Sequence, residues 1–224
     1  MGSVLFGYRK YLLLANRVSL ETLHIPTAKT SVLSIAPSGF SSYLCSVIKT
    51  TYFSHLDNIV MSKTIVVYGS STGTCEAIAE KIAQKLGCEA INVQDFTADV
   101  VNNNQNLILG TSTWGAGELQ DDWYDGLKVL QGADLSGKTI ALFGCGDCES
   151  YSDTFVGGIG ELYNGIKASG ARFVGAVDTD GYTFDDSEAV VDGKFVGLPL
   201  DDVNEDDKTD TRIDAWIAEI SPNL

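Results

Sequence analysis

From Lys63 to Ile220 the chain alternates short, continuous apolar runs with amphipathic segments of helical period. The runs 63–68 and 138–143 show no regular polar alternation, as expected for strands that are buried on both faces. The segment 76–86 instead places its apolar residues at helical spacing and is followed by Gly87. Because right-handed crossovers lay helices on both faces of a parallel sheet, the alternation predicts a doubly wound α/β fold.

The complete pattern predicts a five-stranded parallel sheet. Ligands of such sheets bind at the carboxyl ends of the strands, so the loops after the first, third and fourth strands are the candidate site. The expected strands are 63–68, 89–93, 106–110, 138–143 and 172–177, and the expected helices are 76–86, 123–130, 159–169 and 209–220.

Charge divides the chain near Met61. Residues 1–60 hold five Lys or Arg against two acidic residues, whereas 61–224 hold ten against 28, a net charge of −18. We therefore predict an N-terminal extension, 1–60, outside the fold and one domain, 61–224. The extension is rich in Ser and Thr and poor in acids, and is interpreted as a leader, a mis-called start or a transit peptide. The expected compartment is the cytoplasm, or an organelle stroma or matrix if 1–60 is a transit peptide.

Composition excludes several classes of chemistry. Both histidines, His24 and His55, precede the acidic domain, so that domain cannot build a Ser-His-Asp triad or a histidine zinc site. The five cysteines of the chain are irregularly spaced, which indicates a reducing compartment and no disulfide framework. No apolar run approaches the roughly 20 residues that span a bilayer. No catalytic residue, metal ligand or membrane contact is assigned.

The first candidate loop joins the strand 63–68 to the helix 76–86. Small hydroxylated residues and a glycine before a helix offer unpaired backbone N–H groups and the positive end of the helix dipole, which bind phosphate without Lys or Arg. A plain helix cap would use the same residue types. The assigned phosphate-binding residues are Ser70, Ser71, Thr72, Gly73, Thr74 and Cys75.

The second candidate loop, 111–120, follows the strand 106–110 and carries a Trp among small residues. A Trp at the end of a strand is badly placed for the sheet core and well placed to cover a planar ring, although packing under its own loop is the alternative. The assigned cofactor-binding residues are Thr111, Ser112, Thr113, Trp114 and Gly115.

The third candidate loop, 144–155, combines flexible glycines with a Tyr and carboxylates. Cys145 and Cys148 form a Cys-x-x-Cys pair, for which a redox dithiol is the alternative interpretation. The three loops place a phosphate site, a Trp and a Tyr at one sheet edge, which predicts a site for an aromatic mononucleotide. The assigned residues of this loop are Cys145, Gly146, Asp147, Tyr151 and Asp153.

These motifs resemble the loops that bind flavin mononucleotide (FMN) in the flavodoxin family. The matching segments are 70–74, 113–120 with Trp123, and 144–155, and the resemblance spans about 62–224. It implies the strand order 2-1-3-4-5. The segment 178–200 resembles the insertion that splits the fifth strand in long-chain flavodoxins, and its polarity predicts a surface loop.

The resemblance also implies a role for each loop. Residues 70–75 would hold the FMN phosphate, and Trp114 and Tyr151 would lie on either side of the isoalloxazine ring. Cys75 stands where the family usually has Thr; since a thiol is a weak donor, weaker phosphate binding is expected. In the family the carbonyl after the Trp turns toward flavin N5, and Gly115 would permit that turn. The residues implied at the polar edge of the ring are Asp147 and the backbone of Cys145 and Gly146.

A non-enzymatic electron carrier is the function that the resemblance implies. Its non-covalently bound FMN would cycle mainly between semiquinone and hydroquinone at low potential, because the second electron adds negative charge among carboxylates. The acidic domain would steer it to basic docking faces of redox partners such as reductases and ferredoxin-dependent enzymes. A monomer without nucleic-acid partners is expected. The alternative is an FMN-dependent NAD(P)H quinone reductase on the same fold.

Overall fold

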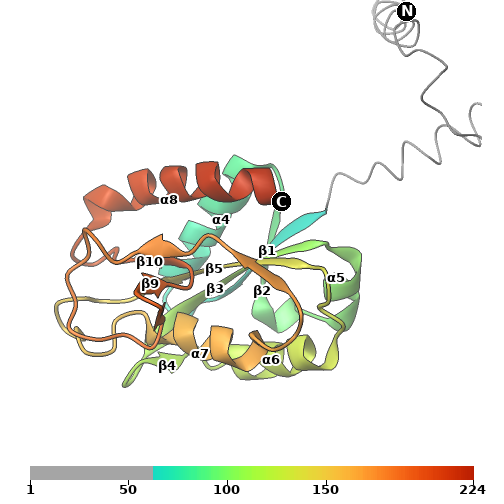
Figure 1. Ribbon diagram of the computed structural model, residues 1–224, viewed down its shortest axis with the longest axis horizontal. Coiled ribbons are helices and arrows are strands. Elements are labelled where there is room, and N and C mark those ends of the chain that lie inside the picture. The colour runs from blue at the N-terminus through green and yellow to red at the C-terminus, as the bar shows by residue number, and fades with distance from the viewer. Residues whose placement is uncertain (1–62) are drawn as a thin grey trace, which may run out of the picture. The chain divides into compact units, whose positions relative to one another are not determined.

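The computed structural model describes residues 63–224, which form a parallel β-sheet with helices on both faces (Figure 1). The predicted extension, 1–60, lies outside the described residues, so the division into extension and domain stays a prediction. Within 63–224, no helix is long and apolar enough to cross a membrane. The strands of the main sheet are β1 (Thr64–Gly69), β2 (Glu89–Asn92), β3 (Asn106–Trp114), β4 (Glu118–Leu119), β5 (Thr139–Cys145), β6 (Arg172–Val174) and β10 (Leu198–Leu200).

Five strands of the main sheet lie in the order β2-β1-β3-β5-β10. Their register is parallel: Val66 of β1 pairs with Ile108 of β3, which pairs in turn with Ala141 of β5. The short strand β4 is antiparallel to the end of β3. Counted without β4, the order is the predicted 2-1-3-4-5, and the predicted fold class is confirmed.

The fifth strand position is shared by two separate segments. β6 pairs with Thr139–Ala141 of β5, and β10 pairs with Phe143–Cys145 further along the same strand. The predicted strand 172–177 therefore ends early, at Val174, where Gly175 takes the left-handed φ of 79°. The prediction of a surface loop over 178–200 is wrong at its end, because β10 is a buried core strand. Between the two segments lies a small antiparallel sheet of β7 (Val177–Asp178), β8 (Val190–Val191) and β9 (Lys194–Phe195).

Two layers of helices cover the sheet. In Figure 1, α4 and α8 lie above the sheet, and α6 and α7 lie below it. Side chains of β1 alternate between the layers: Val66 packs in the cluster with α4 and α8, and Val67 packs in the cluster with α6 and α7. Each such buried side chain stabilises the fold by roughly 1.5–3 kcal/mol relative to an exposed one. The bounds are α4 (Thr74–Leu86), α6 (Trp123–Gly132), α7 (Gly157–Ile166) and α8 (Asp206–Ile220).

Several short elements are absent from the sequence prediction. They are too short to show a hydrophobic period, so their local capping residues are the only signal. Helix α5 begins after Thr97, whose Oγ1 accepts a hydrogen bond from the N–H of Val100 at 3.4 Å. Strand β3 also runs four residues beyond its predicted end, because Gly110–Ser112 pair with β5 and Thr113–Trp114 pair with β4. The unpredicted helices are α5 (Ala98–Asn103) and the 3-10 turns η3 (Val93–Asp95) and η4 (Ser221–Asn223).

Candidate functional site

The loop between β1 and α4 ends in an uncapped helix N-terminus. Gly73 is the N-cap residue, with a left-handed φ of 94°, and no side chain hydrogen-bonds to the first turn. Ser70 Oγ accepts a hydrogen bond from the N–H of Gly73 at 3.1 Å, which closes the turn before the helix. The first N–H groups of α4 are therefore available to an anion at the positive end of the helix.

Trp114 is the last residue of β3 and not a loop residue as predicted, and its side chain is 43% exposed. The indole Nε1–H donates a hydrogen bond to Ser112 Oγ at 2.9 Å, so the exposed ring has a fixed anchor. Between these two residues Thr113 Oγ1 is buried and has no hydrogen-bond partner within the described chain. An unpartnered buried hydroxyl at a pocket wall is a group that a bound ligand can satisfy.

The loop after β5 carries Tyr151, whose side chain is 55% exposed. The loop is shaped by Asp147, whose Oδ1 accepts hydrogen bonds from the N–H groups of Glu149 at 3.1 Å and Ser150 at 2.8 Å. The Ser150 N–H contributes most to lowering the pKa of Asp147 below its ordinary value, so this carboxylate stays ionised.

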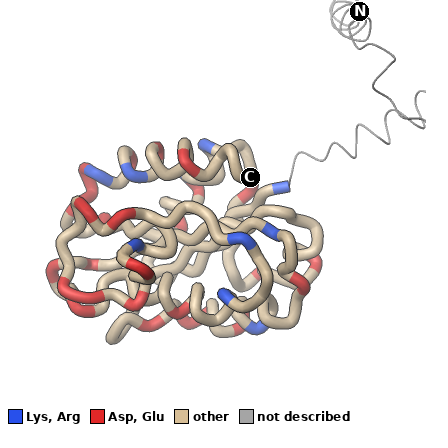
Figure 2. The backbone as a smooth tube through the Cα atoms, viewed as in Figure 1, with Lys and Arg blue, Asp and Glu red and all other residues tan. Residues whose placement is uncertain are grey.

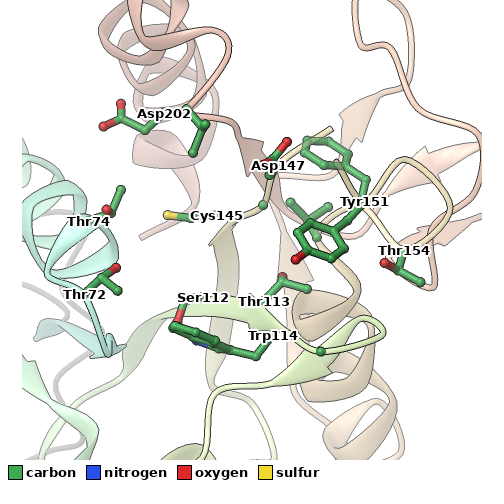
Figure 3. Close-up of a pocket in the computed structure, with 15 residues that line it drawn as sticks. Thr72, Thr74, Ser112, Thr113, Trp114, Cys145, Asp147, Tyr151, Thr154 and Asp202 are labelled. Atoms are coloured by element: carbon green, nitrogen blue, oxygen red, sulfur yellow. The ribbon is translucent and has the colours of Figure 1, made fainter. Parts of the chain in front are cut away.

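A single pocket collects residues from all three predicted loops. Figure 3 shows Thr72 and Thr74 on one side, Tyr151 on the other, Trp114 below and Cys145 between them. The predicted residues that line this pocket are Thr72, Thr74, Ser112, Thr113, Trp114, Gly115, Cys145, Gly146, Asp147 and Tyr151. The predicted residues outside its lining are Ser70, Ser71, Gly73, Cys75, Thr111 and Asp153.

Cys75 lies outside the pocket because its side chain is fully buried on the inner face of α4. Contact with the Cys145 thiol, together with burial, raises the pKa of Cys75 well above its ordinary value. The thiol is thus part of the core, and only the backbone of Cys75 remains at the start of the helix. The Cys75 thiol does not reach the pocket, so a direct contact between this thiol and a phosphate cannot be the cause of the expected weaker phosphate binding.

Of the Cys-x-x-Cys pair, Cys145 lines the pocket and Cys148 lies behind its lining. Cys145 and Cys148 are free thiols and both are buried. Burial, followed by the nearby Asp201 carboxylate, raises the pKa of Cys148 to about 12. A redox dithiol needs a thiolate at neutral pH, so this environment disfavours the dithiol interpretation.

A fourth loop, which the sequence analysis missed, completes the pocket. It follows β10 and contributes Asp202 and Val203. The rule that ligands bind at the carboxyl ends of strands could have found it, but the fifth strand was expected to end at Val177 rather than Leu200. The loop after β5 also contributes more than was assigned, namely Thr154, Phe155 and Val156.

These features fit a phosphorylated planar ligand. The uncapped start of α4 provides N–H donors without Lys or Arg, and two exposed aromatic rings border the same pocket. The pocket wall leaves no room for a side chain at position 146, since a Cβ on Gly146 would lie 2.9 Å from the backbone nitrogen of Val156. The fold and the site together define a doubly wound α/β protein with a pocket at the carboxyl edge of its sheet that suits a phosphorylated planar ligand.

Comparison with known proteins identifies the family. A sequence model described as "Flavodoxin" matches residues 66–216. Flavodoxin 1 of Azotobacter vinelandii is 49% identical over 165 residues, covering 70% of this chain and 95% of the relative. The flavodoxin of Helicobacter pylori is 44% identical over 161 residues, covering 71% of this chain and 97% of the relative. The chain belongs to the flavodoxin family.

Solved structures agree with this assignment. The crystal structure of Fusobacterium nucleatum flavodoxin bound to flavin mononucleotide matches with a TM-score of 0.69 and 34% identity. The match covers 73% of this chain and 99% of that structure. The predicted family resemblance is confirmed.

Proposed function

We propose that this chain binds one FMN non-covalently and carries single electrons between partner enzymes. The observation that carries the proposal is the convergence of an uncapped helix N-terminus and two exposed aromatic rings on one pocket. The family membership and the FMN in the Fusobacterium structure support it. FMN supplies the one-electron chemistry, and the protein binds it, orients it and sets its electrostatic surroundings.

Each loop has a separate part in the proposed complex. The backbone N–H groups at the start of α4 and the hydroxyls of Thr72 and Thr74 would hold the phosphate. The side chains of Trp114 and Tyr151 would cover the two faces of the ring and exclude water from it. The remaining proposed cofactor contacts are Ser70, Ser71, Gly73, Cys75, Thr111, Ser112, Thr113, Gly115, Cys145, Gly146, Asp147 and Asp153.

The electrostatic surroundings favour a low potential. The segments 70–75, 115–122, 146–156 and 201–205 contain no Lys or Arg, whereas three of the four contain several Asp or Glu. In Figure 2 acidic residues gather on the loops at the left of the view. Negative charge added to FMN would be repelled by these carboxylates, so the cofactor would work mainly between semiquinone and hydroquinone.

The same carboxylates define the proposed partners. The acidic segments 115–122, 146–156 and 201–205 together form an acidic rim. Such a rim attracts basic surfaces, so reductases and ferredoxin-dependent enzymes with basic docking faces would meet the protein at the pocket edge. We propose that the protein works as a monomer, with the rim free for one partner at a time.

An absorption spectrum of the purified full chain tests the function. We expect a yellow protein with about one FMN per chain, whose two one-electron steps are separated in a redox titration. Stoichiometric FAD, or no flavin together with no uptake of added FMN, would overturn the proposal. Rapid bleaching of the flavin by NADPH alone would instead favour the quinone reductase.

A further inference from the structure

The fourth loop of the pocket is held by a buried carboxylate. Asp201 directly follows β10 and is 0% exposed. Its Oδ1 accepts hydrogen bonds from the N–H groups of Val203 at 3.0 Å and Asn204 at 2.9 Å. These bonds fold residues 201–204 into a tight turn, which places Val203 and its neighbour Asp202 in the lining of the pocket.

The same carboxylate also binds the loop after β5. Asp201 Oδ2 accepts a hydrogen bond from the N–H of Cys148 at 2.8 Å. The side-chain amide of Asn204 donates to Asp201 Oδ2 at 2.8 Å and to Asp147 Oδ1 at 2.9 Å. Asp147 in turn holds the turn that leads to Tyr151. Two loops that are distant in sequence are thus fixed to one another by one carboxylate and one amide.

Asp201 is ionised although it is buried. Burial alone would raise its pKa, but hydrogen bonds from Asn204 and Cys148 outweigh burial and lower the pKa of Asp201 below its ordinary value. Within 63–224, no Lys or Arg lies within ion-pair distance of this carboxylate. Its charge is therefore compensated by N–H donors from the two loops, and removing the charge weakens every one of those bonds.

We propose that Asp201 is a positioning residue for the flavin ring, which it does not touch. By locking the loops 146–156 and 202–205 together, it would hold the wall of the pocket that faces the ring, opposite the phosphate loop. This inference rests on the proposed binding of FMN. It predicts that loss of Asp201 weakens binding of the ring and leaves recognition of the phosphate intact.

A comparison of riboflavin with FMN separates binding of the ring from recognition of the phosphate, because the two compounds share the ring and only FMN carries the phosphate. The full chain is freed of flavin, and the Kd of each compound is measured for the wild type, Asp201→Asn, Asn204→Ala and Asp207→Asn. Asp207 is the matched control, since it is exposed on α8 and its carboxylate forms no hydrogen bond or ion pair within 63–224. For Asp201→Asn we expect the Kd of both compounds to rise at least about tenfold, with an unchanged ratio between them. For Asn204→Ala we expect a smaller rise, and for Asp207→Asn none.

Amide hydrogen exchange distinguishes positioning from a general loss of stability. In Asp201→Asn the amides of Cys148, Val203 and Asn204 should lose protection, while those of the central strand β1 keep it. Unchanged riboflavin affinity in Asp201→Asn overturns the inference, as does loss of protection across β1. If Asp201→Asn does not fold, Asn204→Ala decides: unchanged riboflavin affinity again overturns the inference. A wild type that binds neither flavin overturns the proposed function instead.

Discussion

The indole nitrogen of Trp114 donates a hydrogen bond to Ser112 Oγ, and the two atoms lie 2.9 Å apart. Both residues point to the same side of β3, since side chains two positions apart share a face of a strand. The pocket thus has an exposed aromatic wall whose orientation depends on a neighbouring hydroxyl.

Replacement of that hydroxyl should weaken FMN binding. In Ser112→Ala the indole loses its anchor and gains rotational freedom, which costs about 0.5–1.5 kcal/mol, or a roughly two- to twelvefold higher Kd. Fluorescence titration of the flavin-free protein with FMN measures the change. Ser112→Thr keeps the hydroxyl and should bind nearly as the wild type does. Equal losses in both variants would show that the hydroxyl is not the cause.

Gly115 is constrained in two ways. Its φ is 53°, in the left-handed region, and a Cβ at this position would meet the Glu118 carboxylate. We expect Gly115→Val to weaken binding of oxidised FMN by about 1–2 kcal/mol from backbone strain, and to lower the maximum fraction of one-electron-reduced flavin. A redox titration followed by absorption gives both quantities. A lower affinity with an unchanged maximum would mean that Gly115 serves the turn alone.

Electron transfer should depend steeply on salt. The acidic rim attracts basic partners over distances comparable to the Debye length, which falls from about 30 Å at 0.01 M to about 8 Å at 0.15 M salt. We expect the second-order rate constant with a basic reductase to fall by at least about tenfold over this range. Stopped-flow measurements at low protein concentration keep the encounter rate-limiting. A flat profile in that regime would contradict docking through the acidic loops.

The thiol of Cys148 should be chemically inert in the folded protein. Burial and the adjacent Asp201 raise its pKa to about 12, so the thiolate fraction at pH 8 is on the order of one in ten thousand. Alkylation by iodoacetamide, mapped by mass spectrometry, should therefore miss Cys148 in the native state and modify it in urea. Fast alkylation of the native protein at this residue would restore the redox-dithiol interpretation.

A chain that starts at Met61 should keep its flavin. The residues that line the pocket and both apolar clusters lie within 63–224. We expect the FMN affinity and the melting temperature of the truncated chain to match those of the full chain. An insoluble or colourless truncated protein would show that the predicted domain boundary is wrong.

Much of the fold can be predicted because buried parallel strands have a strong signal. Val66 and Ile108 lie in continuous apolar runs, and those runs are the central strands. The segment 111–114 was expected to be a loop because it follows the apolar run 106–110, but its backbone pairs with β5 and β4. Whether these residues form a strand depends on hydrogen bonds to the neighbouring strands, and the residue types of 111–114 do not reveal such bonds.

The missed part of the pocket has a similar cause. β10 has only three residues and contains Pro199, so neither its length nor its composition indicates a core strand. Because β10 was not predicted, nothing in the sequence distinguished Asp201 from the other acidic residues around it. Its burial arises from the packing of two distant loops, and a sequence pattern cannot report that.

The split fifth strand also has a consequence for how the chain could be rebuilt. β6 leaves β5 beside Ala141, and β10 rejoins it beside Phe143, so the chain returns almost to the point of departure. A segment whose two ends are that close can be exchanged for another of different length at a small entropic cost. Exposed turns within residues 175–197, such as the turn at Asp192 and Gly193, are therefore suited to insertion of a reporter or a partner-binding domain, whereas Ala189 and Phe195 are buried in the core and must be kept. Any replacement must restore the contacts that this segment makes with the Tyr151 loop, such as the hydrogen bond from Ser187 Oγ to the carbonyl oxygen of Phe155.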